Sequence, residues 1–62
     1  MYENPKYGFG DLVRLKSHPD MIARVICEIW DDDEQKRYYE IEAVWNEKLP
    51  TREVPEESIE GV

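Results

Sequence analysis

Two residues of this chain have side chains that commonly act as bases or nucleophiles, a single histidine, His18, and a single cysteine, Cys27. His18 could act as a catalytic base or a pH switch, but Ser17 and Pro19 flank it and indicate a surface turn. Cys27 lies in an apolar alternation without a neighbouring cation, so we expect a buried, unreactive thiol. One histidine and one cysteine also cannot build a structural zinc site.

The carboxylates are the other candidates for chemistry. The acidic run at 31–34 lacks the alternating ligands, the glycine and the final glutamate of an EF-hand loop. We interpret it as a solvated hairpin loop whose charge discourages aggregation. Pairs such as Glu40 and Glu42 could do acid–base work only in a cleft that separates their pKa values, and the interior of a small β-barrel is filled by side chains. We therefore expect no enzyme activity, no metal and no cofactor.

Length and charge exclude further classes. The chain has 62 residues, which indicates one small domain. Eight Lys and Arg against fifteen Asp and Glu give a net charge of −7, which argues against direct nucleic-acid binding and against an anionic membrane surface. No apolar run approaches the ~20 residues of a membrane-spanning helix. The single cysteine excludes an intrachain disulfide and favours a reducing compartment, the cytoplasm.

Apolar residues recur with a period of two through most of the chain, which predicts strands rather than helices. We expect an N-terminal arm over 1–9, which docks through Tyr7 and Phe9 or frays. The expected strands are 12–16, 21–30, 37–46, 49–54 and a short last strand from Ile59, which follows a 3-10 turn over 55–58. Five short strands joined by turns describe a small all-β barrel over 10–62.

The odd-numbered residues of these strands form the expected inner face. The expected core comprises Val13, Leu15, Met21, Ala23, Val25, Cys27, Ile29, Tyr39, Ile41, Ala43, Trp45, Val54 and Ile59. In the long hairpin, same-face pairing then requires partner numbers with an even sum. We select a sum of 68, which places Trp30 opposite Tyr38; the rival sum of 66 places Arg24 opposite Glu42.

Several motifs resemble those of the YodC-like small bacterial proteins. They are GDLVRLKS at 10–17, Pro19, Met21, Trp45 and VPEESI at 54–59. The resemblance covers most of the chain and implies an SH3-like barrel related in shape to KOW and Tudor modules, without a particular activity. It also suits a bacterial or phage origin. This sequence departs from the family pattern in having His18 in place of the glycines expected in the first turn, and in its longer second and third strands with an acid-rich loop between them.

The outer face of the long hairpin is the expected binding surface. The expected partner-binding residues are Ile22, Arg24, Ile26, Trp30 and Tyr38. An exposed apolar strip on a small chain is typical of a surface for a protein partner or for self-association. The alternatives are that a bent second strand lets both faces pack, or that the arm covers this face. An aromatic cage needs more converging rings than this surface offers.

Two functional hypotheses follow. The first is a non-catalytic protein-interaction module of SH3-like shape, with no small-molecule substrate. The second is an acidic inhibitor whose carboxylates replace the phosphates of a nucleic acid on a basic host protein. The interspersed basic residues argue against the second, since a good mimic would segregate its charge.

Overall fold

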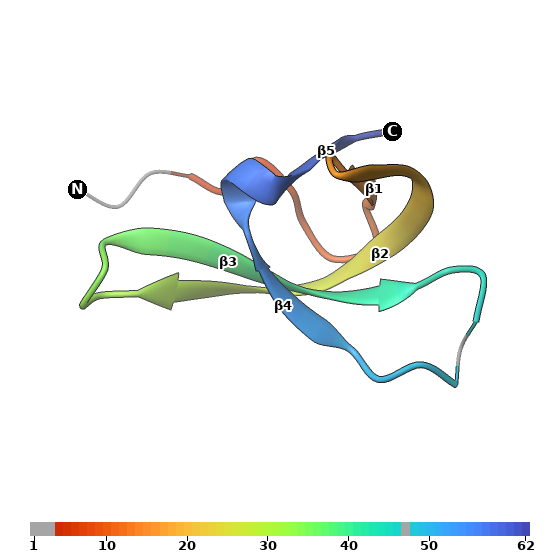
Figure 1. Ribbon diagram of the computed structural model, residues 1–62. Helices are drawn as coiled ribbons and strands as arrows, with labels where there is room; N and C mark the ends of the chain where they lie inside the picture. The colour runs from red at the N-terminus through yellow and green to blue at the C-terminus, as the bar shows by residue number, and fades with distance from the viewer. Residues whose placement is uncertain (1–3, 47) are drawn as a thin grey trace.

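The computed structural model describes residues 4–46 and 48–62. These residues form the strands β1 (Leu12–Leu15), β2 (His18–Asp31), β3 (Lys36–Ala43), β4 (Arg52–Pro55) and β5 (Ile59–Gly61), with a 3-10 turn, η1 (Glu56–Ser58), before β5 (Figure 1). The strands make one antiparallel sheet in the order β4-β3-β2-β1-β5. The all-β fold and the 3-10 turn are confirmed. A closed barrel is not, because β4 and β5 lie at opposite ends of the order and no pairing joins them within the described residues.

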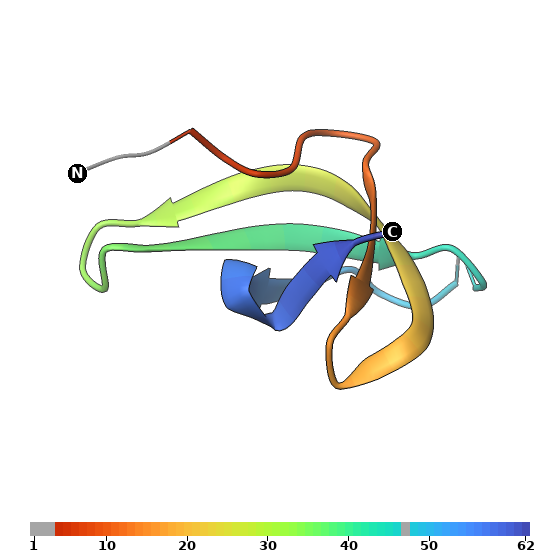
Figure 2. The ribbon, with the colours of Figure 1, turned by 90° about the horizontal axis from the view of Figure 1, so that it is seen from above.

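The long strand β2 organises the sheet because it pairs with β1 near its beginning and with β3 along the rest of its length. Its ribbon curves strongly between these two partners (Figures 1 and 2). β2 already starts at His18, so the first turn is shorter than expected. β3 ends at Ala43 rather than at residue 46. Just beyond it, the backbone N–H of Val44 still donates a hydrogen bond to the carbonyl oxygen of Ile22 on β2, at 3.2 Å. Beyond this point the curvature of β2 leaves β3 without a partner strand.

A β-bulge at Ile26 divides β2 into two registers. Partner numbers sum to 66 up to Val25, which pairs with Ile41, and to 67 beyond the bulge, where Trp30 pairs with Arg37. The uniform sum of 68 is therefore wrong. A bulge places two residues of one strand opposite one residue of its partner, so the parity of the inward-facing residues changes at this point.

Because of the bulge, the residues of β2 beyond Ile26 lie on the opposite faces from those expected. Beyond it, even-numbered residues share the inner face with Tyr39, as Glu28 does by pairing with it directly. Cys27 is exposed, and Ile29 lies opposite Tyr38 on the outer face. Trp30 is therefore not opposite Tyr38.

The core is smaller than expected. Its buried apolar residues are Val13, Ala23, Val25, Tyr39, Ile41, Val54 and Ile59, all of them expected. Leu15 packs against this cluster, while Ala43 and Ile29 are only half-buried. Met21 and Trp45 were expected inside and are exposed, and Trp45 lies beyond the sheet because β3 ends at Ala43.

The N-terminal arm covers the part of the inner face that lies towards the β2–β3 hairpin. The backbone N–H of Lys6 donates to the Tyr39 hydroxyl at 3.1 Å, and the ring of Tyr7 meets that of Tyr39 edge-on, with centroids 5.5 Å apart. Arg37 Nη1 donates to the carbonyl of Asn4 at 3.1 Å. Phe9 takes no part in this docking, since it is 82% exposed.

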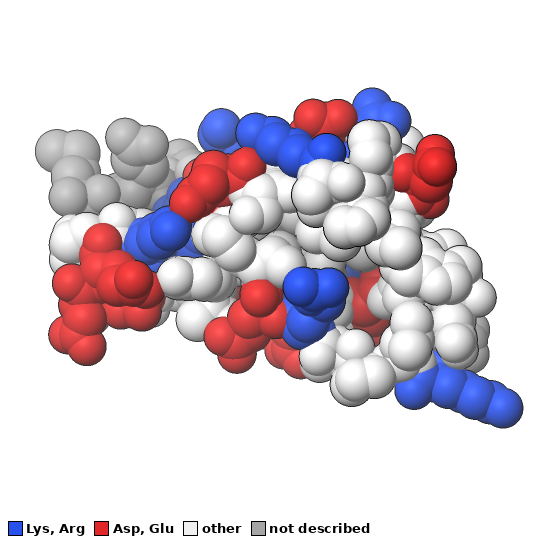
Figure 3. Space-filling view, viewed as in Figure 1, with Lys and Arg blue, Asp and Glu red and all other residues white. Residues whose placement is uncertain are grey.

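The acidic loop of the β2–β3 hairpin is held by its own hydrogen bonds. Asp31 Oδ1 accepts from the backbone N–H groups of Asp33 and Glu34, at 2.9 and 3.2 Å. Acidic side chains gather at the end of the molecule where this loop lies, whereas acidic and basic side chains are interspersed elsewhere on the face that Figure 3 shows. This arrangement agrees with the expected solvated loop.

Candidate binding pocket

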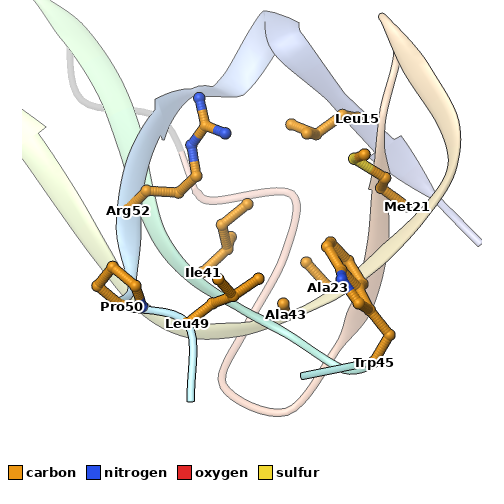
Figure 4. A pocket seen from close by; sticks show the side chains of 9 residues that line it. All are labelled: Leu15, Met21, Ala23, Ile41, Ala43, Trp45, Leu49, Pro50 and Arg52. Carbon is orange, nitrogen blue, oxygen red and sulfur yellow. The ribbon is translucent and has the colours of Figure 1, made fainter. Parts of the chain in front are cut away.

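The inner face has a pocket of about 240 Å³ at the end of the sheet away from the arm. It is lined by Leu15, Met21, Ala23, Ile41, Ala43, Trp45, Leu49, Pro50 and Arg52 (Figure 4). Eight of these nine side chains are apolar. In Figure 4, Arg52 and Pro50 lie on one side of the pocket, and Met21 and Trp45 lie on the other.

Two small residues and the early end of β3 account for the pocket. Ala23 and Ala43 are directly paired across β2 and β3, so the middle of the pocket is lined by two methyl groups instead of long side chains. The chain then leaves the sheet after Ala43 and returns at Arg52, carrying Trp45 and Leu49 around the opening. The hollow is therefore a continuation of the core that small residues leave unfilled.

The rim of the pocket exposes large apolar side chains. Trp45 is 54% exposed, Leu49 43% and Met21 39%. Isolated exposed apolar residues are ordinary on protein surfaces, but several around one concave site are typical of binding surfaces. The pocket thus combines exposed apolar groups with a concave shape.

Arg52 is the one charged residue in the lining. Within residues 4–46 and 48–62, its side chain makes no ion pair and no hydrogen bond, whereas Arg14, Arg24 and Arg37 each pair with a glutamate. In a chain with a net charge of −7, a guanidinium without a described carboxylate partner is an exception. It gives an otherwise apolar pocket one positively charged edge.

A second cluster lies under the arm and contains charged groups. Arg37, which is 6% exposed, donates from Nε to Glu28 Oε2 at 2.7 Å and lies 3.6 Å from Glu56 Oε2 through Nη1. The Tyr39 hydroxyl donates to Glu56 Oε2 at 2.7 Å. Burial, together with this hydrogen bond, raises the pKa of Tyr39 to about 12. A tyrosine held in its neutral form beneath the arm is a poor general base at neutral pH, so we interpret this cluster as structural.

The expected partner-binding residues do not form one strip. Ile22 is half-buried and pairs with Arg14 on β1, and Arg24 forms an ion pair with Glu42 at 3.0 Å. Ile26 is the unpaired residue of the bulge.

The other two members of the expected strip lie on opposite faces. Trp30 is on the inner face. The Arg37 guanidinium carbon lies 5.5 Å from the centroid of its ring, and its indole N–H donates to Asp32 at 2.8 Å. Tyr38 lies on the outer face and donates its hydroxyl to Glu34 at 2.8 Å. The bulge thus separates two aromatic residues that a uniform register would bring together.

The single histidine and the single cysteine are both exposed. His18 is exposed, with its Nδ1 3.0 Å from the hydroxyl of Ser17. Cys27 is exposed rather than buried, and its Sγ–H donates to Glu40 Oε1 at 3.4 Å. That hydrogen bond, with a smaller contribution from desolvation, raises the pKa of the thiol. In the described ranges, no group of three or more His, Cys, Asp or Glu side chains could hold a metal ion.

Comparisons with protein-family models, with curated proteins and with solved structures found no match to this chain. No helix in the part of the chain that the structure describes is long and apolar enough to cross a membrane.

Sequence reasoning missed the pocket because it assigned Trp45 and Met21 to a filled core and gave Leu49 and Arg52 no role. One signal was available. An uninterrupted strand from 37 to 46 would be longer than the usual 5–6 residues, and an earlier end would release Trp45 from the sheet.

Proposed function

We propose that this chain is a non-catalytic protein-interaction module of SH3-like shape, related to the YodC-like proteins, which binds a segment of a partner protein in the pocket beside Trp45. The observation that carries the proposal is the open apolar pocket of about 240 Å³ with large, half-exposed apolar side chains at its rim. Binding at such a site is favourable because an apolar side chain of the partner replaces the water in the pocket.

The arrangement of strands supports the SH3-like part of the proposal. A long, curved second strand is shared between the β1–β5 pair on one side and the β3–β4 pair on the other. A short 3-10 turn links β4 to β5, which pairs with β1. This order of strands matches a small barrel opened along the β4–β5 seam.

Trp45 is the expected centre of binding energy. Tryptophan is enriched among the few interface residues whose truncation costs most affinity, and these residues typically contact a well-packed pocket. Here the indole lines the pocket together with Met21 and exposes 54% of its surface. A bound side chain can therefore contact the ring without a rearrangement of the sheet.

The test is selection of a phage-displayed library of random peptides on the folded protein, followed by titration of the selected peptides. We expect Trp45→Ser to weaken binding by about 30-fold or more, as for a central interface tryptophan. Val44→Ser is the matched control, because Val44 is 42% exposed beside Trp45 but does not line the pocket. It should bind the selected peptides with the affinity of the parent.

The two tryptophans provide an internal control by NMR. On peptide binding, the indole N–H resonance of Trp45 should shift, while that of Trp30 should stay in place because it donates to Asp32 in the hairpin, away from the pocket. Peptides that bind Trp45→Ser as tightly as the parent would place the binding surface elsewhere and refute the proposal.

The acidic-inhibitor hypothesis has less support. Several of the glutamates that could imitate phosphates are paired with basic side chains of the same molecule, as Glu60 is with Arg14 and Glu57 with Lys36, both at 2.9 Å. Such pairs reduce the negative potential that a mimic needs. The interaction module is therefore the function that we propose.

A further inference from the structure

We propose that the segment bound in this pocket presents a large apolar side chain next to an Asp or Glu side chain, and that Arg52 binds the carboxylate. The inference rests on the proposed function and adds the chemistry of the partner. It assigns Arg52 as the residue that determines specificity, while the apolar lining supplies most of the affinity.

The position of Arg52 supports an acidic neighbour to the apolar group. Its side chain lines the pocket and has no ion pair or hydrogen bond with a described residue. When a bound segment displaces water from the pocket, a guanidinium without an acceptor would lose hydration without compensation. A carboxylate replaces that hydration best, because its two oxygens match the donor geometry of the guanidinium.

The rest of the surface makes this position selective. With fifteen acidic residues against eight basic ones, the chain as a whole repels acidic segments. A bound carboxylate is therefore favourable beside the pocket only where a cation is available to receive it. Arg14, Arg24 and Arg37 are already paired with glutamates of their own chain, which leaves Arg52 as the described arginine able to receive one.

The lining favours a side-chain carboxylate over the free C-terminus of a peptide. Sites that bind a chain terminus commonly surround it with converging backbone N–H groups. Here Pro50, close to Arg52 in the lining, has no N–H group, and the remaining lining side chains are apolar. A single guanidinium at the edge of an apolar hollow suits an acidic side chain on a segment that continues past the pocket.

The first test is selection of the phage-displayed peptide library on two proteins, the parent and Arg52→Glu. The parent should enrich peptides with Asp or Glu next to a large apolar residue. Arg52→Glu should enrich Lys or Arg at the same place while keeping the apolar residue. Because the Arg52 side chain has no described partner, the exchange should leave the melting temperature close to that of the parent.

The second test measures the contact itself with a selected peptide that is acetylated and amidated at its ends. Replacing its acidic residue with the corresponding amide, or Arg52 with Gln, should each weaken binding by about fivefold, as for a partly exposed ion pair. The two changes together should cost no more than either alone. Arg24→Gln is the control, since it changes the net charge equally at a site outside the pocket.

The outcomes separate this inference from the proposed function. Peptides that require Trp45 but show no acidic preference and bind Arg52→Gln normally would overturn the inference alone. Peptides that lose binding when their C-terminus is amidated would also overturn it, in favour of a terminal carboxylate. A concentration-dependent dimer that Trp45→Ser abolishes would make the occupant a second copy of the chain. A selection without any peptide that depends on Trp45 would overturn both proposals.

Discussion

Replacing Arg37 with Met removes the cation beneath the N-terminal arm while keeping much of the length of its side chain. The Arg37 side chain is 5% exposed, and those of Glu28 and Glu56 are 25% and 22% exposed. Breaking a buried ion pair by removing one partner costs about 3–5 kcal/mol, because the other charge is left poorly solvated. The two carboxylates are partly accessible to water, so we expect the lower end, about 3 kcal/mol.

The matched control is Arg24→Met, because Arg24 and Glu42 form a pair whose side chains are 46% and 40% exposed. That exposed pair should contribute less than about 1 kcal/mol. In thermal unfolding followed by circular dichroism, Arg37→Met should melt about 12–24 °C below the parent, as 1 kcal/mol corresponds to about 4–8 °C in a domain of this size. Equal melting temperatures for the two variants would refute the claim that the cluster under the arm stabilises the fold.

Three further predictions follow from burial and from the shifted pKa values. Trp45→Ala should cost about 1–2 kcal/mol in urea denaturation, against about 2–5 kcal/mol for Ile59→Ala; a larger cost at Trp45 would return that residue to the core. Burial and its hydrogen bond raise the pKa of Tyr39 to about 12. An unfolded tyrosine titrates near pH 10. The stability that comes from keeping Tyr39 neutral is therefore complete below pH 10 and is lost as the pH rises through the pKa of the folded state. The ultraviolet absorbance of tyrosinate measures the titration, and a protein in which every tyrosine titrates near pH 10 would contradict the prediction. The hydrogen bond to Glu40 raises the pKa of the exposed Cys27 thiol, so iodoacetamide should modify it more slowly than a free cysteine at neutral pH, and Glu40→Gln should react faster than the parent; equal rates would contradict the assignment.

The sequence was sufficient to predict the strands and much of the core, because both depend on local alternation. Val25 and Ile41 are inward-facing residues predicted from a period of two, and both are buried. The register of the hairpin was not predictable from alternation. A single sum of partner numbers describes an unbroken ladder, whereas the unpaired residue Ile26 changes the sum partway along β2. The observed pairs include Arg24 opposite Glu42 from the rival register, so charge pairing predicted one half of the hairpin better than apolar pairing did.

The candidate site could not be predicted because it depends on where elements are missing. Trp45 continues the apolar face of its strand in the sequence, and only the end of β3 at Ala43 makes it part of an open rim. Arg52 is likewise an ordinary surface arginine until the fold places it in an apolar lining. Neither property is local, since each depends on residues from other strands.

The bulge at Ile26 affects the curvature of the long hairpin but not the choice of partners on either side of it. If Ile26 were deleted, Cys27 would follow Val25 in an unbroken ladder, and the existing partners Ile41 and Glu40 would already be adjacent. The partners on both sides would be kept, and what would be lost is the additional bend and twist that a bulge introduces. β2 can thus lose one residue without changing which side chains reach the core, whereas an inserted residue would need a second bulge. The extra residue serves the shape of the sheet, and it gives this strand a tolerance to shortening that a regular strand does not have.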